Sequence, residues 1–300
     1  MKNLVAGGAG FLGSHIIDSL MMSGEDVICL DNLTSGNINN VRRWLNDPKF
    51  VFIEHDILDP LIDIKVDKIW HFSCVASPAL YQLDPIKTLN VCFNGTLNLL
   101  ELARLNNAKF LLASSSEVYG IAEEYPQNEK YNGSVNPFCY RSCYSEGKRI
   151  SETLCYSYKK IYKLDISIAR IFNAYGPRMQ PNDGRVISNF VGNALKKDSI
   201  FINGDGSQTR SFCYVDDIVD GLLKLMNSDY SIPINFGNPN EEYSIIEIAN
   251  LIFKILKFNV DVEFLSPIMD EPRRRKPDIS LANESLSWYP KYSIIEGLSK

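Results

Sequence analysis

Residues 3–17 have the sequence NLVAGGAGFLGSHII, and this stretch decides the fold. A largely apolar strand at residues 3–6 is followed by glycine at positions 7, 10 and 13. Glycines spaced in this way allow a tight turn, a close approach of the backbone to a pyrophosphate, and packing of a helix on the strand. The N-terminus of that helix would face the phosphates. The stretch therefore predicts a strand, a glycine-rich turn and a helix that bind a dinucleotide.

A second apolar strand, residues 26–30, ends at Asp31. An acidic residue at this distance from the glycines takes the ribose hydroxyls of NAD. Asn32 follows it, with no Arg or Lys immediately after, which favours NAD over NADP because a carboxylate would repel a 2′-phosphate. The alternative is that Asp31 only caps a turn.

Strands alternate with helices through the first half of the chain. Further apolar strands are expected at residues 50–53, 68–73, 109–113 and 166–170, with long helices at 88–105 and 146–162. Near-continuous apolar strands suit a parallel sheet that is covered on both faces. The pattern predicts an α/β fold, a doubly wound (Rossmann) sheet, with ligands at the carboxyl ends of the strands.

Beyond residue 172 the pattern loosens, and Gly and Pro recur. We expect residues 1–172 to form the dinucleotide-binding domain. Residues 211–238 would return to it through a helix at 216–226 and a strand at 233–236. Residues 173–210 and 239–300 would form a smaller, discontinuous substrate-binding lobe.

Composition fits an enzyme with a large core: 300 residues, 45% hydrophobic and 22% charged, with a net charge of −5. A negative net charge does not indicate binding to nucleic acid, and no stretch of the sequence is long and apolar enough to span a bilayer. Seven cysteines without a C-x-x-C pair are interpreted as reduced thiols of a cytoplasmic protein. The three histidines have no spacing suited to a metal, and we expect none.

Tyr144 and Lys148 are the strongest catalytic candidates. Four residues of separation place them on one face of a helix, where the ammonium group can lower the pKa of the phenol. A phenol shifted toward the working pH can act as a general base beside a nicotinamide. A solvated helical face is the competing interpretation of the same spacing.

The chain resembles the extended short-chain dehydrogenase/reductases that act on nucleotide sugars, and within them the UDP-glucuronate decarboxylases (UDP-xylose synthases). The resemblance runs from residue 4 to about residue 298. It rests on five stretches: LLASSSEVYG at 111–120, RSCYSEGKR at 141–149, NDGRV at 182–186, GDGSQTRSF at 204–212 and RKPDI at 275–279.

The resemblance implies that Tyr144, assisted by Lys148 and Ser115, removes the proton of the C4 hydroxyl of UDP-glucuronate while NAD takes the C4 hydride. The resulting 4-keto acid loses CO₂, and return of the hydride gives UDP-xylose. Glu117 and Arg275 are expected near the departing carboxylate. The alternative for Glu117 is a buried structural carboxylate paired with an Arg. A homodimer built on the two long helices is also implied.

The resemblance also implies two sets of binding residues. The cofactor is expected to contact Gly7, Gly10, Phe11, Leu12, Asp31, Asn32, Asp56, Ile57, Ser73, Tyr144 and Lys148. The UDP-sugar is expected to contact Tyr81, Asn173, Arg185, Arg210 and Arg275, and the arginines would supply bidentate donors to phosphate or carboxylate.

Two other functions remain open. A 4,6-dehydratase of the GDP-mannose type also carries a Ser/Thr-Ser-Glu strand end, but its base segment and later motifs fit this chain less well, and NADP is its commoner cofactor. Ser116 stands where dTDP-glucose-type dehydratases have an Asp that helps to expel water, which disfavours water elimination. Alternatively, the chain is a silent sugar-nucleotide binder. Ser145, where most decarboxylases have Asp, leaves that possibility open, whereas the retained Tyr144, Lys148, Ser115 and Glu117 argue against it.

Overall fold

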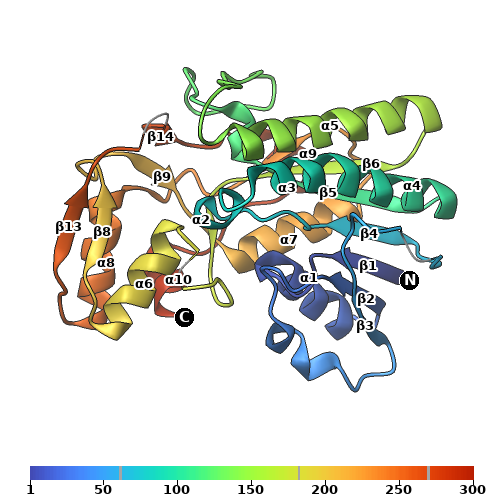
Figure 1. Cartoon of the computed structure of the whole chain (residues 1–300), viewed down its shortest axis with the longest axis horizontal. Helices are drawn as coiled ribbons and strands as arrows, with labels where there is room; N and C mark the ends of the chain where they lie inside the picture. The colour runs from blue at the N-terminus through green and yellow to red at the C-terminus, as the bar shows by residue number, and fades with distance from the viewer. Residues whose placement is uncertain (61–62, 182, 269–270) are drawn as a thin grey trace.

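The computed structural model describes residues 1–60, 63–181, 183–268 and 271–300, so residue 182 of the motif at 182–186 lies outside the described residues. Seven parallel strands form the central sheet in the order β11-β6-β5-β4-β1-β2-β3 (Figure 1). Their bounds are β1 (Lys2–Ala6), β2 (Asp26–Asp31), β3 (Phe50–Glu54), β4 (Lys68–His71), β5 (Lys109–Ser115), β6 (Ile166–Ile171) and β11 (Ile234–Phe236). This order confirms the doubly wound α/β fold.

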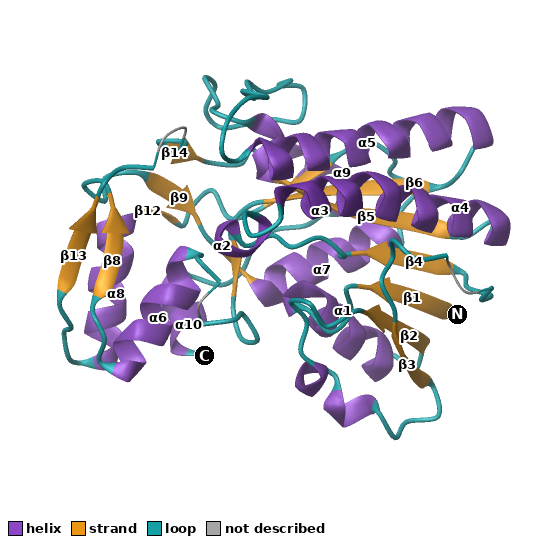
Figure 2. Cartoon of the chain, in the orientation of Figure 1, coloured by secondary structure: helices purple, strands orange, loops and turns teal. Residues whose placement is uncertain are grey.

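Helices cover both faces of the sheet (Figure 2). On one face lie α1 (Phe11–Met22) and α7 (Val215–Met226); on the other lie α3 (Pro85–Asn90), α4 (Thr96–Asn106) and α5 (Ser142–Tyr162). Strand alternation explains the two cores, because Val5 packs in one cluster while Leu4 and Ala6 pack in the other. The sheet is therefore buried on both sides, as its apolar strands predict.

Three expected boundaries were wrong. The helix expected at 88–105 is interrupted by a π-helical segment, η3 (Val91–Gly95), where Gly95 fits closely against Ile57: a Cβ would lie 2.4 Å from Ile57 Cδ1. The helix expected from residue 146 begins at Ser142. β4 ends at His71 rather than at residue 73, because the chain leaves the sheet there to form a wall of the site described below.

The rest of the chain is built of short elements beside the carboxyl ends of the strands (Figure 2). α6 (Val186–Lys196) and α8 (Ile245–Leu256) pack together next to a parallel pair of strands, β8 (Ile200–Asn203) and β13 (Val262–Leu265). A three-stranded sheet, β12 (Glu242–Ser244), β9 (Thr209–Ser211) and β14 (Arg274–Arg275), brings Arg275 into register with Arg210. β7 (Ala174–Tyr175) pairs with β10 (Cys213–Tyr214).

The chain crosses between these two regions more than once. α7 packs on α1, and β11 pairs with β6 at the sheet edge. α9 (Ser280–Leu286) packs on α7 and β11, although it belongs to the range 239–300 that we assigned to the smaller lobe, whereas α10 (Ile294–Ser299) packs on α8 and β10. We keep the division into two lobes as a proposal, with α9 at their border.

Candidate active site

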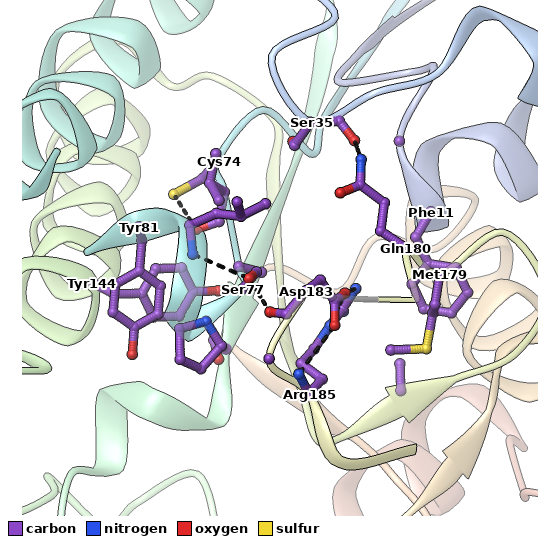
Figure 3. Close-up of a pocket in the computed structure, with 18 of the residues that line it drawn as sticks. Phe11, Ser35, Cys74, Ser77, Tyr81, Tyr144, Met179, Gln180, Asp183 and Arg185 are labelled. Atoms are coloured by element: carbon purple, nitrogen blue, oxygen red, sulfur yellow. Dashed lines mark hydrogen bonds and ion pairs between the residues drawn. The ribbon is translucent and has the colours of Figure 1, made fainter. Parts of the chain in front are cut away.

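A cavity of about 620 Å³ lies at the carboxyl ends of β1, β4 and β5 (Figure 3). The sequence-predicted site residues that line it are Gly7, Gly10, Phe11, Leu12, Asp31, Asn32, Asp56, Ile57, Ser73, Tyr81, Ser115, Glu117, Tyr144, Lys148, Asn173, Arg185 and Arg210. Arg275 is also a predicted site residue, but it does not line the cavity. Residues from both halves of the chain therefore line the same cavity.

The turn between β1 and α1 needs glycine for steric reasons. Gly7 has φ +76°, and a Cβ there would lie 2.7 Å from the Phe72 carbonyl carbon. A Cβ on Gly13 would lie 2.2 Å from Gly7 O. Phe11 and Leu12 line the cavity at the start of α1, where backbone N–H groups have no partner within the helix. This cradle fits the pyrophosphate of a dinucleotide.

Asp31 ends β2 beside this cradle and is buried. Its Oδ2 accepts a hydrogen bond from the Ala9 N–H at 2.9 Å, and its Oδ1 accepts one from the Leu33 N–H at 2.8 Å. Burial raises the pKa of this carboxyl, although both N–H donors oppose the shift. Nearby, Asn32 Nδ2 donates to Asp56 Oδ2 at 2.8 Å. These carboxylates fit the hydroxyls of a ribose.

Helix α5 brings Tyr144 and Lys148 to the cavity. Lys148 Nζ donates to the Ala113 carbonyl at 2.8 Å and lies 5.8 Å from the centroid of the Tyr144 ring. Tyr81 stacks on that ring, with centroids 5.0 Å apart and planes within 4° (Figure 3). The buried Tyr81 hydroxyl finds no hydrogen-bond partner among the described residues, so a polar ligand can bind there.

The pKa of Tyr144 differs from the sequence-based expectation. Burial raises it well above the usual value, and only the hydrogen bond with Ser115 is a prominent opposing influence. The helical spacing placed Lys148 beside the ring correctly, but burial of the phenol decides the direction of the shift. Tyr144 is therefore protonated at neutral pH.

Glu117 lies at the centre of a charged cluster between β5 and α5. Arg141 Nη2 lies 2.7 Å from Glu117 Oε1, and Arg275 Nη2 lies 3.5 Å from the same atom. Burial alone would raise the pKa of Glu117, but the guanidinium groups of Arg275 and Arg141 lower it to about 2. Glu117 is consequently an anion at neutral pH.

Arg275 lies behind Glu117 instead of facing the cavity. It is 3% exposed and donates to the carbonyls of Ser116 and Gly120, the latter at 3.2 Å. The structure thus pairs Arg275 with Glu117 and does not put it in position to contact a ligand in the described cavity.

The other two predicted arginines line different parts of the cavity. Arg210 is nearly buried and pairs with Glu271 at 2.9 Å, and burial lowers its pKa to about 10. Arg185 Nε donates to Asp183 at 2.7 Å, and its guanidinium lies 5.6 Å from the centroid of the Phe11 ring at the start of α1. Arg185 is therefore close to the dinucleotide cradle.

Asn173 lies where β6 has ended, with φ +27°. Its Nδ2 donates to the Ser211 carbonyl at 3.1 Å, which leaves its side-chain oxygen available toward the cavity that it lines.

Sequence reasoning missed Arg141 and Arg178. Arg141 immediately precedes α5 and lies three residues before Tyr144, but because the helix was expected to begin at residue 146, Arg141 was not placed beside the Tyr144 face. Arg178 lies in the loop after β7 and pairs with Asp18 of α1, a contact between distant segments that no local pattern signals.

Comparison with known proteins agrees with this geometry. Residues 4–300 match the family model described as GDP-mannose 4,6 dehydratase. The chain is 48% identical to UDP-glucuronic acid decarboxylase 6 of Arabidopsis thaliana, over 99% of this chain and 87% of that protein. It is 49% identical to UDP-glucuronic acid decarboxylase 1 of Xenopus tropicalis, over 99% of this chain and 70% of that protein.

Among solved structures, UDP-glucuronic acid 4-epimerase from Bacillus cereus, in complex with UDP-glucuronic acid and NAD, superposes with a TM-score of 0.90. The two chains are 29% identical, and the match covers 99% of this chain and 96% of the epimerase. In the part of the chain that the structure describes, no helix has both the length and the apolar character needed to cross a membrane.

Proposed function

Since the chain belongs to the GDP-mannose 4,6-dehydratase family, and within it to the UDP-glucuronic acid decarboxylases, we propose that it converts UDP-glucuronate to UDP-xylose and CO₂ with NAD as cofactor. The observation that carries this proposal is the meeting of Tyr144, Ser115 and Glu117 around the cavity that also contains the glycine cradle. An acid–base group and a dinucleotide site are what an oxidation-dependent decarboxylation needs.

NAD fits the residues present. The α1 N-terminus and Gly7 would hold the pyrophosphate, and Asp31 would accept the ribose hydroxyls. When bound, NAD supplies the oxidant that makes the C4 alcohol a ketone for a time, so that the hexuronic acid becomes a β-keto acid that loses CO₂ readily.

Tyr144 is the proton acceptor of this proposal, and Ser115 bonds the same sugar hydroxyl. Ser115 already hydrogen-bonds the phenol, which opposes the effect of burial on its pKa. Lys148 is held by the Ala113 carbonyl below the Tyr144 ring, where its charge favours the phenolate over the phenol. The same phenol can later return the proton to the C4 oxygen.

The charged cluster would receive the sugar carboxylate. Two guanidinium groups (Arg141 and Arg275) and one carboxylate (Glu117) leave one net positive charge. Arg141 lines the cavity and can donate to the substrate directly. Arg275 would act through Glu117, by fixing its position and keeping it ionised.

The diphosphate would bind farther along the cavity. Arg210 and Arg185 provide guanidinium groups there, and Asn173 provides a neutral polar group. Tyr81 stacks on Tyr144, so we propose that its hydroxyl contacts the sugar. Arg185 lies over Phe11, so we propose that it binds ligand atoms at the place where the substrate and the cofactor meet.

We further propose that the chain forms a homodimer through the outer surfaces of α4, α5 and the preceding η3. Apolar side chains there are exposed, among them Phe93 (41%), Leu105 (68%), Tyr156 (63%) and Ile161 (67%). Exposed apolar residues gathered on neighbouring helices are typical of an interface. Light scattering should give twice the mass of one chain, and Phe93→Glu should reduce it, whereas Phe264→Glu on β13 should not.

The activity is tested by incubating the purified protein with UDP-glucuronate and NAD and identifying the sugar nucleotide by mass spectrometry and NMR. UDP-xylose with release of CO₂ supports the proposal. A product that has lost water instead indicates a dehydratase, and binding without any product indicates a silent binder.

A further inference from the structure

Cys74 and Cys92 are close together beside the proposed base, with their sulfur atoms 3.2 Å apart. Cys74 follows β4 and lines the cavity, where it is half-buried (Figure 3). Cys92 belongs to the π-helical segment η3 and is buried.

The two thiols differ in a way that suits oxidation. The hydrogen bond from Cys92 lowers the pKa of the Cys74 thiol, and the Lys148 ammonium group acts in the same direction against burial. The same hydrogen bond between the two thiols, together with burial, raises the pKa of the Cys92 thiol. Thiolate character and access to the cavity are therefore both found at Cys74, and an attacking cysteine needs both.

Cys92 is also in contact with α5, the helix that carries Tyr144 and Lys148. A Cβ on Gly147 would lie 2.8 Å from Cys92 Sγ, and the Cys92 carbonyl accepts a hydrogen bond from Ser151 at 2.8 Å. Gly147 and Ser151 flank Lys148 on α5. Any shift of the Cys92 sulfur consequently moves atoms that pack directly against the segment carrying Tyr144 and Lys148.

We propose that Cys74 and Cys92 are a redox-sensitive modification site, which a peroxide converts reversibly to a disulfide that slows the activity proposed above. This inference rests on that proposed function for its consequence, but not for its chemistry. Oxidation would draw the two sulfurs together, pull Cys92 away from Gly147 and displace α5 relative to Ser115.

The chemistry balances with hydrogen peroxide as the oxidant. The Cys74 thiolate attacks one peroxide oxygen, the O–O bond breaks, and the leaving hydroxide takes a proton to become water. The resulting sulfenic acid is attacked by the Cys92 sulfur, which forms the S–S bond and releases a second water. Two electrons pass from the thiols to the peroxide, and a dithiol reductant reverses the step.

The experiment treats the wild type, Cys74→Ser, Cys92→Ser and Cys139→Ser with hydrogen peroxide. Cys139 is the matched control, because it is a half-buried thiol near the start of α5 whose sulfur has no thiol partner among the described residues. Each treated protein is compared with its own untreated sample. Intact mass, peptide mapping, turnover of UDP-glucuronate and NAD affinity are measured before and after dithiothreitol.

The wild type and Cys139→Ser should lose two hydrogens, yield a peptide linking residues 74 and 92, and recover with dithiothreitol. Their turnover should fall about tenfold or more while oxidised, since displacing a reacting group by about 1 Å costs up to about 100-fold. Cys92→Ser should instead carry a sulfenic acid at Cys74 that dimedone traps. Bound NAD should slow the oxidation, because it would cover Cys74 in the shared cavity.

Absence of the linked peptide in the wild type would overturn the proposal, and so would a disulfide that changes neither turnover nor NAD affinity. These readouts also separate this inference from the proposed function. If the untreated protein makes no UDP-xylose, the decarboxylase proposal fails, while the disulfide and its effect on NAD affinity still decide the thiol proposal.

Discussion

The guanidinium of Arg141 clamps the carboxylate of Glu117, with Nη2 donating to Oε1 at 2.7 Å and Nε donating to Oε2 at 3.4 Å. This contact joins the 3-10 turn that follows β5, η4 (Ser116–Tyr119), to the residue before α5, and so fixes the distance between the two halves of the proposed catalytic machinery. The Arg141 carbonyl also accepts a hydrogen bond from Ser145 at 3.0 Å. Ser145 thus has a structural role at the position where most decarboxylases have Asp.

Replacing Arg141 should impair catalysis through Glu117. We expect Arg141→Met to lower kcat/KM about 10²-fold or more, because a charge-assisted pair in a partly buried site is lost. Arg141→Lys should restore part of kcat, since the charge returns without the fork geometry. Steady-state kinetics of both variants check this. Equal losses in the two variants would contradict the proposed dependence on charge.

Acid should remove a stability contribution that comes from Glu117. Its folded-state pKa of about 2 is lower than the ordinary value of 4.5, so the contribution is full above about pH 4.5 and is lost as the pH falls toward 2. The difference in free energy of unfolding between the wild type and Glu117→Gln should therefore shrink over this range. Urea titrations at several pH values measure it, and a constant difference would refute the assignment.

Tyr144→Phe should lower kcat by about 10²–10⁴-fold, the usual contribution of a positioned acid–base group. Tyr81→Phe is the matched control: its ring can still stack on Tyr144, and its hydroxyl has no partner in the described structure, so KM should change more than kcat. Because burial raises the pKa of Tyr144, wild-type kcat should rise from neutral to alkaline pH. A flat pH profile would show that another group is the base.

Gly13→Ala should abolish NAD binding, because the new Cβ would lie 2.2 Å from Gly7 O and push the cradle apart. Gly24→Ala is a suitable control. Gly24 also has a positive φ, +75°, but the nearest atom to a Cβ there is Lys49 Nζ at 3.7 Å, outside the cavity lining. Calorimetry should find near-normal NAD affinity in Gly24→Ala despite some loss of stability.

Arg275→Ala should nearly abolish turnover although Arg275 does not line the cavity. Its loss would remove one of the two guanidinium groups that hold Glu117 and leave the carbonyls of Ser116 and Gly120 without this donor. If Arg275 acts through Glu117, the double variant with Glu117→Gln should be little worse than either single variant. Multiplicative losses in the double variant would show a separate contact with the substrate.

The local sequence pattern predicted the sheet, because the apolar strands and the turn at glycines 7, 10 and 13 depend on the backbone preferences of the residues that form them. It could not predict the interruption at η3, which depends on how Gly95 fits against Ile57. The clustering of candidate residues at one cavity followed from strand ends that meet at one edge. The orientation of Arg275 and the raised pKa of Tyr144 did not follow, because both depend on burial and on partners distant in sequence.

The central claim is that transient oxidation at C4 makes loss of CO₂ possible. UDP-glucuronate that carries deuterium at C4 and ¹³C at C6 tests it most directly, with product isotopes and reduced cofactor followed together. We expect ¹³CO₂, UDP-xylose that still carries deuterium at C4, and no stoichiometric accumulation of NADH. Release of ¹³CO₂ with deuterium lost to solvent, or a product that keeps its ¹³C, would contradict it.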